Sequence, residues 1–156
     1  MHLDYLINAP LIFTLHAHDI VINEEQEFTI PEENRERIQQ NALSAALNMQ
    51  IQNTLPIGAS AKLFFSNTPN IDIYNPNTYN FMKQVTIHSF NQDPGFQNVK
   101  LELIKEELNV FTAEQVFMRL SFSFEETGSP VTIHASSGDY IHLKGMISAA
   151  ILIEED

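Results

Sequence analysis

The sequence predicts an all-β domain, an antiparallel β-sandwich of Ig-like or jelly-roll-like type with one or two short helices. Two observations carry this prediction. Apolar residues recur at every second position in several segments, and turn-forming residues separate those segments at short intervals. The chain has 156 residues, 44% of them hydrophobic and 18% charged, which is enough apolar material for one packed core. We therefore expect a single domain over 1–156.

The clearest alternation lies near the end of the chain. The segment 116–125 places apolar side chains on one face of a strand and polar side chains on the other. The apolar face holds Met118, Leu120, Phe122 and Phe124, and the polar face holds Arg119, Ser121, Ser123 and Glu125. The segment 140–153 alternates in the same way and predicts a long last strand that bends at Gly145.

Further strands are expected earlier in the chain. The segment 43–52 alternates too, and this two-residue period favours a strand although its alanines would tolerate a helix. The others lie near 11–22, 59–66, 83–90 and 98–104. Proline, glycine, asparagine and serine predict turns at 55–58, 67–70, 93–95, 127–130 and 136–139. Short strands separated in this way are typical of a sandwich.

Two places carry the signals of a helix start. A proline and two glutamates at 31–33 suit the first turn of a helix, where the missing N–H costs nothing and negative charge meets the helix dipole. A short helix is therefore expected over 31–40. Thr112 and Gln115 have the spacing of a capping box and predict a single helical turn there.

The two helix signals lie in similar surroundings. Residues 28–34 resemble 101–107, and each stretch is followed by a helix signal, an amphipathic strand, a proline turn and another strand. This order suggests an internal duplication of about 24–66 and 98–148. The alternative is a coincidence of features that many β-sandwiches share.

The formal net charge is −12, from 20 acidic and 8 basic residues. Such a chain repels phosphate backbones, so nucleic acid is not an expected partner. Six glutamates are expected to form a solvated surface, with a divalent-cation site as the alternative: Glu24, Glu25, Glu27, Glu32, Glu33 and Glu36. No membrane insertion is expected, because no apolar stretch approaches the roughly 18 residues of a span. The first ten residues lack the basic and long apolar regions of a secretion signal and open directly into strand-like sequence, so we expect a module cut from a longer protein.

No catalytic, metal or cofactor site is predicted. The chain has no cysteine, no Gly-x-Ser-x-Gly elbow and no glycine-rich phosphate loop. The serines at 136–137 beside His134 are expected to form a turn, and glutamates adjacent in sequence do not span a cleft as glycosidase chemistry requires. His16 and His18 would share one face of a strand, but a closed zinc site needs about four ligands. We expect neither an enzyme nor a bound cofactor.

The most distinctive polar stretch is 67–80, which is rich in asparagine and holds two tyrosines. Amides and an aromatic face suit a sugar, which presents hydroxyl groups and apolar C–H faces. The candidate ligand-binding residues are Tyr74, Asn75, Asn77 and Tyr79. The alternative is an ordinary long loop whose tyrosines pack on the edge of the sandwich.

Two motifs resemble a known group of proteins. Residues 53–65 read Asn-Thr-Leu-Pro-Ile-Gly-Ala-Ser-Ala-Lys-Leu-Phe-Phe, and 137–145 read Ser-Gly-Asp-Tyr-Ile-His-Leu-Lys-Gly. Together they resemble β-sandwich modules of large bacterial cell-surface or exported proteins. The resemblance implies the sandwich fold and an extracytoplasmic location. It implies no site residues, because these motifs are structural.

Exposed strand edges are the physical reason to expect partners, because unpaired backbone N–H and C=O groups bind other strands. The segment 1–22 is the expected edge, to be covered by a protein partner or a neighbouring domain. The function expected is therefore that of a non-enzymatic structural or interaction module of an exported or cell-surface bacterial protein. The alternative is a carbohydrate-binding or adhesion domain that uses the loop 67–80, with a glycan as its partner.

Overall fold

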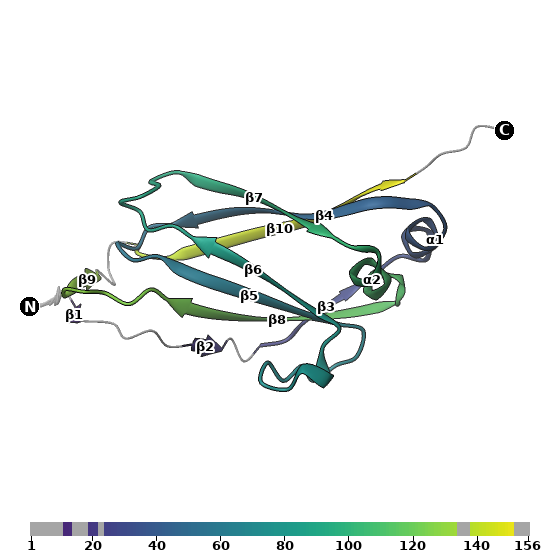
Figure 1. Ribbon diagram of the computed structural model, residues 1–156, viewed down its shortest axis with the longest axis horizontal. Coiled ribbons are helices and arrows are strands. Elements are labelled where there is room, and N and C mark those ends of the chain that lie inside the picture. The colour runs from purple at the N-terminus through teal and green to yellow at the C-terminus, as the bar shows by residue number, and fades with distance from the viewer. Residues whose placement is uncertain (1–10, 14–18, 22–23, 134–137, 152–156) are drawn as a thin grey trace, which may run out of the picture.

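The computed structural model describes residues 11–13, 19–21, 24–133 and 138–151. Two antiparallel sheets pack face to face, and two short α-helices lie together at one end of the sandwich (Figure 1). The prediction of an antiparallel β-sandwich with one or two short helices is confirmed. Neither α-helix in the described part of the chain is long and apolar enough to cross a membrane.

One sheet has three strands and the other has five. The three-stranded sheet has the order β10 (Ile141–Ile151), β4 (Ala42–Asn53) and β7 (Phe96–Leu103). In the five-stranded sheet, β2 (Asp19–Val21) and β3 (Gln26–Thr29) pair one after the other with the same edge of β8 (Gln115–Phe124), which is followed by β5 (Ala59–Ser66) and β6 (Phe81–Ile87). A separate small pair consists of β1 (Leu11–Phe13) and β9 (Val131–Ile133).

The strands lie close to where alternation predicts them, with two exceptions. β3 and β9 were not expected, since they have four and three residues and are too short for a two-residue period to be recognised. Within the expected strand 11–22, the described residues form β1 and β2, and the remainder lies outside the described part of the chain. β2 is at the edge of its sheet, where it pairs with β8.

The helix expected over 31–40 is present as α1 (Glu32–Asn41). The capping box predicted at Thr112 is wrong. Gln115 already begins β8, and the Thr112 hydroxyl donates to the carbonyl of Asn109 at 2.8 Å, which closes the 3-10 turn η2 (Asn109–Thr112). The helix starts earlier, as α2 (Lys105–Leu108), where the Glu107 carboxylate accepts the N–H of Ile104 at 3.0 Å.

The main core lies between the two sheets and is built from the alternating positions of every long strand. On β8, Leu120 and Phe122 pack against this core as predicted. The opposite face of β8 is not left to water, contrary to expectation: Ser121 is only 2% exposed. Beside it on that face, Phe117 is buried in a second, smaller cluster that includes Ile71 of the loop 67–80.

The strand pairing has a twofold regularity. β3 pairs with β8 as β7 pairs with β4, and β5 pairs with β8 as β10 pairs with β4. In each half a short helix connects the first strand to the second, α1 in one case and α2 in the other. No residue-level comparison tests the duplication, which stays a prediction. The correspondence is incomplete in one respect: β6 lies on the outer edge of β5, and no described strand lies on the equivalent edge of β10.

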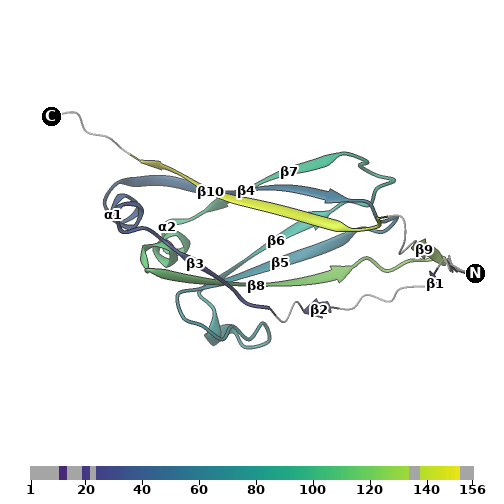
Figure 2. The same ribbon diagram turned by 180° about the vertical axis from the view of Figure 1, so that it is seen from behind.

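The two long sides of the sandwich differ as a result. On one side, the Gln97 side chain of β7 donates to the carbonyl of Thr86 at 2.7 Å and accepts the N–H of His88 at 3.2 Å, so it occupies the outer edge of β6. Lys83 and Glu107 form an ion pair at 2.7 Å on the same side. On the other side, β10 and β3 are the edges of their sheets (Figure 2). This second side is called the open side below.

Candidate functional site

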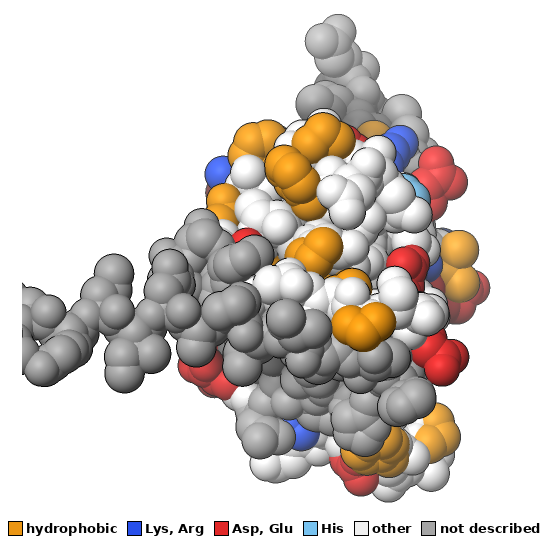
Figure 3. Space-filling model, turned by 90° about the vertical axis from the view of Figure 1, so that its left-hand side faces the viewer, with side chains coloured by type: hydrophobic (Ala, Val, Ile, Leu, Met, Phe, Trp, Pro, Cys, Tyr) orange, Lys and Arg blue, Asp and Glu red, His pale blue; other side chains and the backbone are white. Residues whose placement is uncertain are grey.

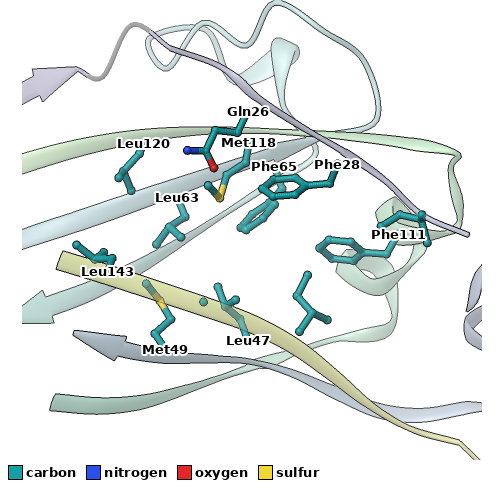
Figure 4. Close-up of a pocket in the computed structure, with 13 residues that line it drawn as sticks. Gln26, Phe28, Leu47, Met49, Leu63, Phe65, Phe111, Met118, Leu120 and Leu143 are labelled. Carbon is teal, nitrogen blue, oxygen red and sulfur yellow. The ribbon is translucent and has the colours of Figure 1, made fainter. Parts of the chain in front are cut away.

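An apolar cleft of about 360 Å³ lies between the sheets on the open side. Side chains from both sheets line it (Figure 4), among them Leu47, Met49 and Leu143 from the three-stranded sheet, and Leu63, Phe65 and Met118 from the other. Gln26 is the one polar side chain among the described residues that line the cleft. The cleft falls within the roughly 300–1,000 Å³ range of pockets that bind small molecules or side chains.

The alternation of the edge strands builds the walls of the cleft. On β10, the odd-numbered Leu143, Gly145 and Ile147 turn inward, and on β3 the side chain of Phe28 does the same. Ile147 and Phe28 are 38% and 41% exposed, so apolar surface reaches the rim of the cleft. A Cβ atom at Gly145 would lie 3.4 Å from Leu47 Cδ1, so the glycine keeps the middle of this wall open.

The backbone of β10 faces the same opening. The N–H of Thr54 donates to the carbonyl of Tyr140 at 2.9 Å, in register with the pairing of β10 and β4. In an antiparallel pair this places the ladder bonds to β4 at the even-numbered residues of β10. The odd-numbered residues, whose side chains line the cleft, therefore direct their N–H and C=O groups to the outer edge. Within the described residues, β10 pairs with β4 alone.

The described lining of the cleft is apolar apart from Gln26 and holds no acid, base or nucleophile. The described residues also hold no cluster of three or more histidines and acids that could bind a metal ion. His88 and His142 are exposed. His16, His18, His134 and the serines at 136–137 lie outside the described residues. Sequence reasoning missed the cleft, because its walls come from strands that are distant in the chain.

The loop 67–80 covers part of the outer face of the five-stranded sheet. Ile71 is 1% exposed and packs with Phe64 and Phe117. The ring of Tyr79 meets that of Phe64 edge to face, with a centroid distance of 4.9 Å. Asn70 has a φ of +69°, a left-handed conformation that asparagine tolerates better than most residues.

Two charged side chains hold the loop in place. The Glu25 carboxylate accepts the N–H groups of Asn70 at 3.0 Å and of Ile71 at 2.7 Å. Arg119 donates to the carbonyl of Ile71 at 2.6 Å. Glu25 therefore differs from the solvated glutamate that its acidic neighbourhood predicts, and Arg119 on β8 contacts the loop rather than water alone.

The four residues predicted to bind a sugar lie in this loop but differ in their surroundings. Tyr74 is 73% exposed, whereas Tyr79 is half-buried against the sheet. The side-chain oxygen of Asn75 accepts the N–H of Asn77 at 3.1 Å and caps the 3-10 turn η1 (Pro76–Thr78). Packing on the sandwich thus occurs for one tyrosine of the two, and sugar binding stays a prediction.

Replacing Glu25 by alanine is expected to lower the free energy of unfolding by about 1–2 kcal/mol, because two N–H groups lose a charged acceptor. Amide hydrogen exchange at Ile71 should accelerate, since this amide is held by Glu25. Glu27→Ala is the matched control two positions further along, where the carboxylate accepts from the exposed Gln115 side chain at 2.6 Å. Equal exchange at Ile71 in both variants would contradict the role given to Glu25.

Comparison with known proteins adds little to this picture. No family model matches the sequence. No curated protein matches it either. A chain from the solved structure of Desmodium yellow mottle tymovirus aligns over 99% of this chain and 96% of its own length, with 12% sequence identity and a TM-score of 0.29. At that TM-score the likeness supports no conclusion about fold or function.

Proposed function

We propose that the protein is a non-enzymatic interaction module that binds an extended apolar polypeptide segment along β10. The observation that carries this proposal is an apolar cleft at Leu143, Gly145 and Ile147, the same residues whose outer strand edge pairs with no other described strand. An added strand would pair with the backbone of β10 and place every second side chain in the cleft. The resemblance of 53–65 and 137–145 to bacterial modules supports an exported or cell-surface protein as the context of this activity.

The expected affinity of the cleft for an extended segment is moderate. Burying an aliphatic side chain contributes about 1.5–3 kcal/mol, and each net backbone hydrogen bond contributes about 0.5–1.5 kcal/mol. Ordering a flexible segment and losing its free motion offset much of this gain. A segment that places three side chains in the cleft should therefore bind with a Kd on the order of 1–100 µM.

The net charge narrows the class of partner. At −12, the module repels segments that are themselves strongly acidic and favours neutral or basic ones. Polar groups in the inward face of a segment would lose water without finding partners, since Gln26 is the one polar side chain in the described lining. The preferred partner thus alternates apolar inward positions with polar outward positions.

Selection from a library of displayed linear peptides tests the proposal. The enriched peptides should carry apolar residues at alternate positions and should slow amide exchange at Leu143, Gly145 and Ile147. Phe28→Ser should weaken their binding about tenfold, which corresponds to about 1.4 kcal/mol, because it removes apolar surface at the rim. Phe90→Ser is the matched control, since Phe90 is 45% exposed, against 41% for Phe28, and does not line the cleft.

Two outcomes of this selection would contradict the proposal. One is enrichment of peptides without alternation. The other is equal binding by the Phe28→Ser and Phe90→Ser variants, which would place the contact away from the cleft.

The alternative function, carbohydrate binding or adhesion through the loop 67–80, is supported by the 73% exposure of Tyr74 beside the amides of Asn75 and Asn77. A glycan array separates it from peptide binding. A glycan that binds the protein, and loses binding on Tyr74→Ala but not on Phe28→Ser, would favour the loop over the cleft.

A further inference from the structure

We infer that the segment bound along β10 is residues 1–9 of a second copy of this chain, an inference that rests on the proposed function. The position it fills is defined by the twofold regularity of the strand pairing. β5 and β10 hold corresponding positions in this pairing, beside β8 and β4, and β6 lies on the outer edge of β5. The equivalent edge of β10 is where the described part of the chain has no strand and where the cleft opens.

The composition of 1–9 matches the requirement of the cleft. Apolar residues stand at every odd position, Met1, Leu3, Tyr5, Ile7 and Ala9. Polar residues stand at three of the four even positions, His2, Asp4 and Asn8. An extended segment with this pattern carries one apolar and one largely polar face. It is not strongly acidic and contains no proline, so every residue after the first has a backbone N–H that could pair with a strand edge.

β6 shows what a strand in such a position looks like in this protein. Its seven residues read Phe-Met-Lys-Gln-Val-Thr-Ile, with Phe81, Val85 and Ile87 buried on the inward face. Residues 1–7 read Met-His-Leu-Asp-Tyr-Leu-Ile, with apolar residues at the same first, fifth and seventh places. The two stretches therefore offer the same inward pattern to strands in corresponding positions.

The lengths also agree. At about 3.3 Å per residue, residues 1–9 span about 26 Å when extended, and the stretch of β10 between Leu143 and Ile147 spans about 13 Å. The segment can therefore cover the whole cleft while its first and last residues pair beyond it. β10 itself has 11 residues, so the strand edge is long enough for nine.

The direction of the chain favours a second copy over the same copy. β1, β2 and β3 follow one another from the end of the molecule where β9 lies towards the end where α1 lies (Figure 1). A chain that continued straight back from Leu11, which pairs with Ile133, would lead away from the cleft of its own copy. Reaching that cleft would require a reversal at Pro10, whereas the cleft of another copy requires none.

Among the described residues at that end of the molecule, hydrophobic side chains lie in separate groups among polar and acidic ones (Figure 3). Both copies carry a charge of −12, so they repel each other, and salt should strengthen the association by screening that repulsion.

Sedimentation velocity of the full chain tests the inference first. The protein should associate as its concentration rises, and more so at high salt. Leu3→Asp with Ile7→Asp should weaken association at least tenfold, because both changes fall on the apolar face. His2→Asp with Asn8→Asp is the matched control, since it adds the same number of acidic groups on the polar face. At high salt, where charge repulsion is screened, this control should leave association within about twofold.

Variants of the receiving strand complete the test. Gly145→Pro removes an N–H from the outer edge of β10, where proline is tolerated because no ladder bond to β4 is lost. Gly145→Ala keeps that N–H and is its control. The Leu3→Asp, Ile7→Asp variant and the Gly145→Pro variant should each be monomeric alone. They should form a heterodimer when mixed, because the first variant keeps an intact β10 edge and the second keeps an intact segment 1–9. Circular dichroism verifies folding, and Phe28→Ser replaces Gly145→Pro if the proline variant does not fold.

The outcomes separate this inference from the proposed function. A full chain that stays monomeric, but binds selected alternating peptides at β10, overturns the inference and leaves the function standing. A monomer in which Leu3→Asp and Ile7→Asp accelerate exchange at Gly145 shows that the segment binds its own copy, which also overturns it. If neither the segment nor any selected peptide binds, both proposals fall.

Discussion

Replacing Phe65 by alanine is expected to lower the free energy of unfolding by about 3–5 kcal/mol, the usual range for a buried aromatic residue. Phe65 is 3% exposed at the centre of the main core. Its ring stacks on Phe81 with a centroid distance of 4.9 Å and meets Phe111 edge to face at 5.8 Å. The substitution removes apolar contact area and two ring pairs, and it leaves a cavity that joins the cleft.

Chemical denaturation measures this effect. Phe90→Ala is the control, because Phe90 is 45% exposed and its loss should cost less than about 1 kcal/mol. Since domains of this kind are stable by about 5–15 kcal/mol, the alanine variant can be largely unfolded in water. In that case Phe65→Leu is measured instead, and it should lower the free energy of unfolding by about 1–2 kcal/mol. A loss below 1 kcal/mol for Phe65→Ala would show that the three rings do not organise the core.

The second large effect is expected at Asn53, where replacement by alanine should lower the free energy of unfolding by about 2–4 kcal/mol. Asn53 is 4% exposed at the end of β4. Its amide nitrogen donates to the carbonyls of Ile57 at 2.8 Å and His88 at 2.9 Å, and its oxygen accepts the N–H of Leu55 at 2.9 Å. Alanine would leave these three backbone groups without their partner, and buried unpaired groups are costly.

Asn48→Ala provides a control on the same strand. The Asn48 side chain is half-buried and makes one hydrogen bond, to the Ser148 hydroxyl at 2.7 Å, so its loss should cost about 0.5–1.5 kcal/mol. If the two variants lose equal stability, the turn does not depend on Asn53. The contacts of Asn53 also give the motif at 53–58 a physical meaning: its first residue holds the turn between β4 and β5 and ties it to the end of β6.

The long strands were predictable because their information is local. Leu47, Met49 and Ile51 alternate with polar residues, and a strand turns such residues to one face wherever it lies. The first turn of α1 was predictable for the same reason, since a proline and two glutamates act on the nearest free N–H groups. The prediction of a capping box at Thr112 is wrong because the Thr112 hydroxyl binds within η2 and Gln115 pairs with β3 as the first residue of β8.

The candidate site was not predictable in this way. The sequence predicts that Gly145 bends a strand, but in the structure Gly145 lines a cleft together with Phe28 and Met118 from other strands. Glu25 reads as one of six solvated glutamates, yet it binds the backbone of a loop 45 positions further along the chain. Both roles depend on which distant strands become neighbours.

The amino-acid sequence by itself determined the sandwich class, the inward face of each long strand and the position of α1, because side-chain periodicity and helix-start chemistry act within a few residues. Tertiary structure alone decided that Gln97 binds the backbone at the end of β6, while the outer edge of β10 pairs with no other described strand. The physical reason is that strand pairing depends on backbone hydrogen bonds, which every residue but proline offers alike. The order of strands in a sheet, and any cleft between two sheets, is therefore settled only when the whole chain packs.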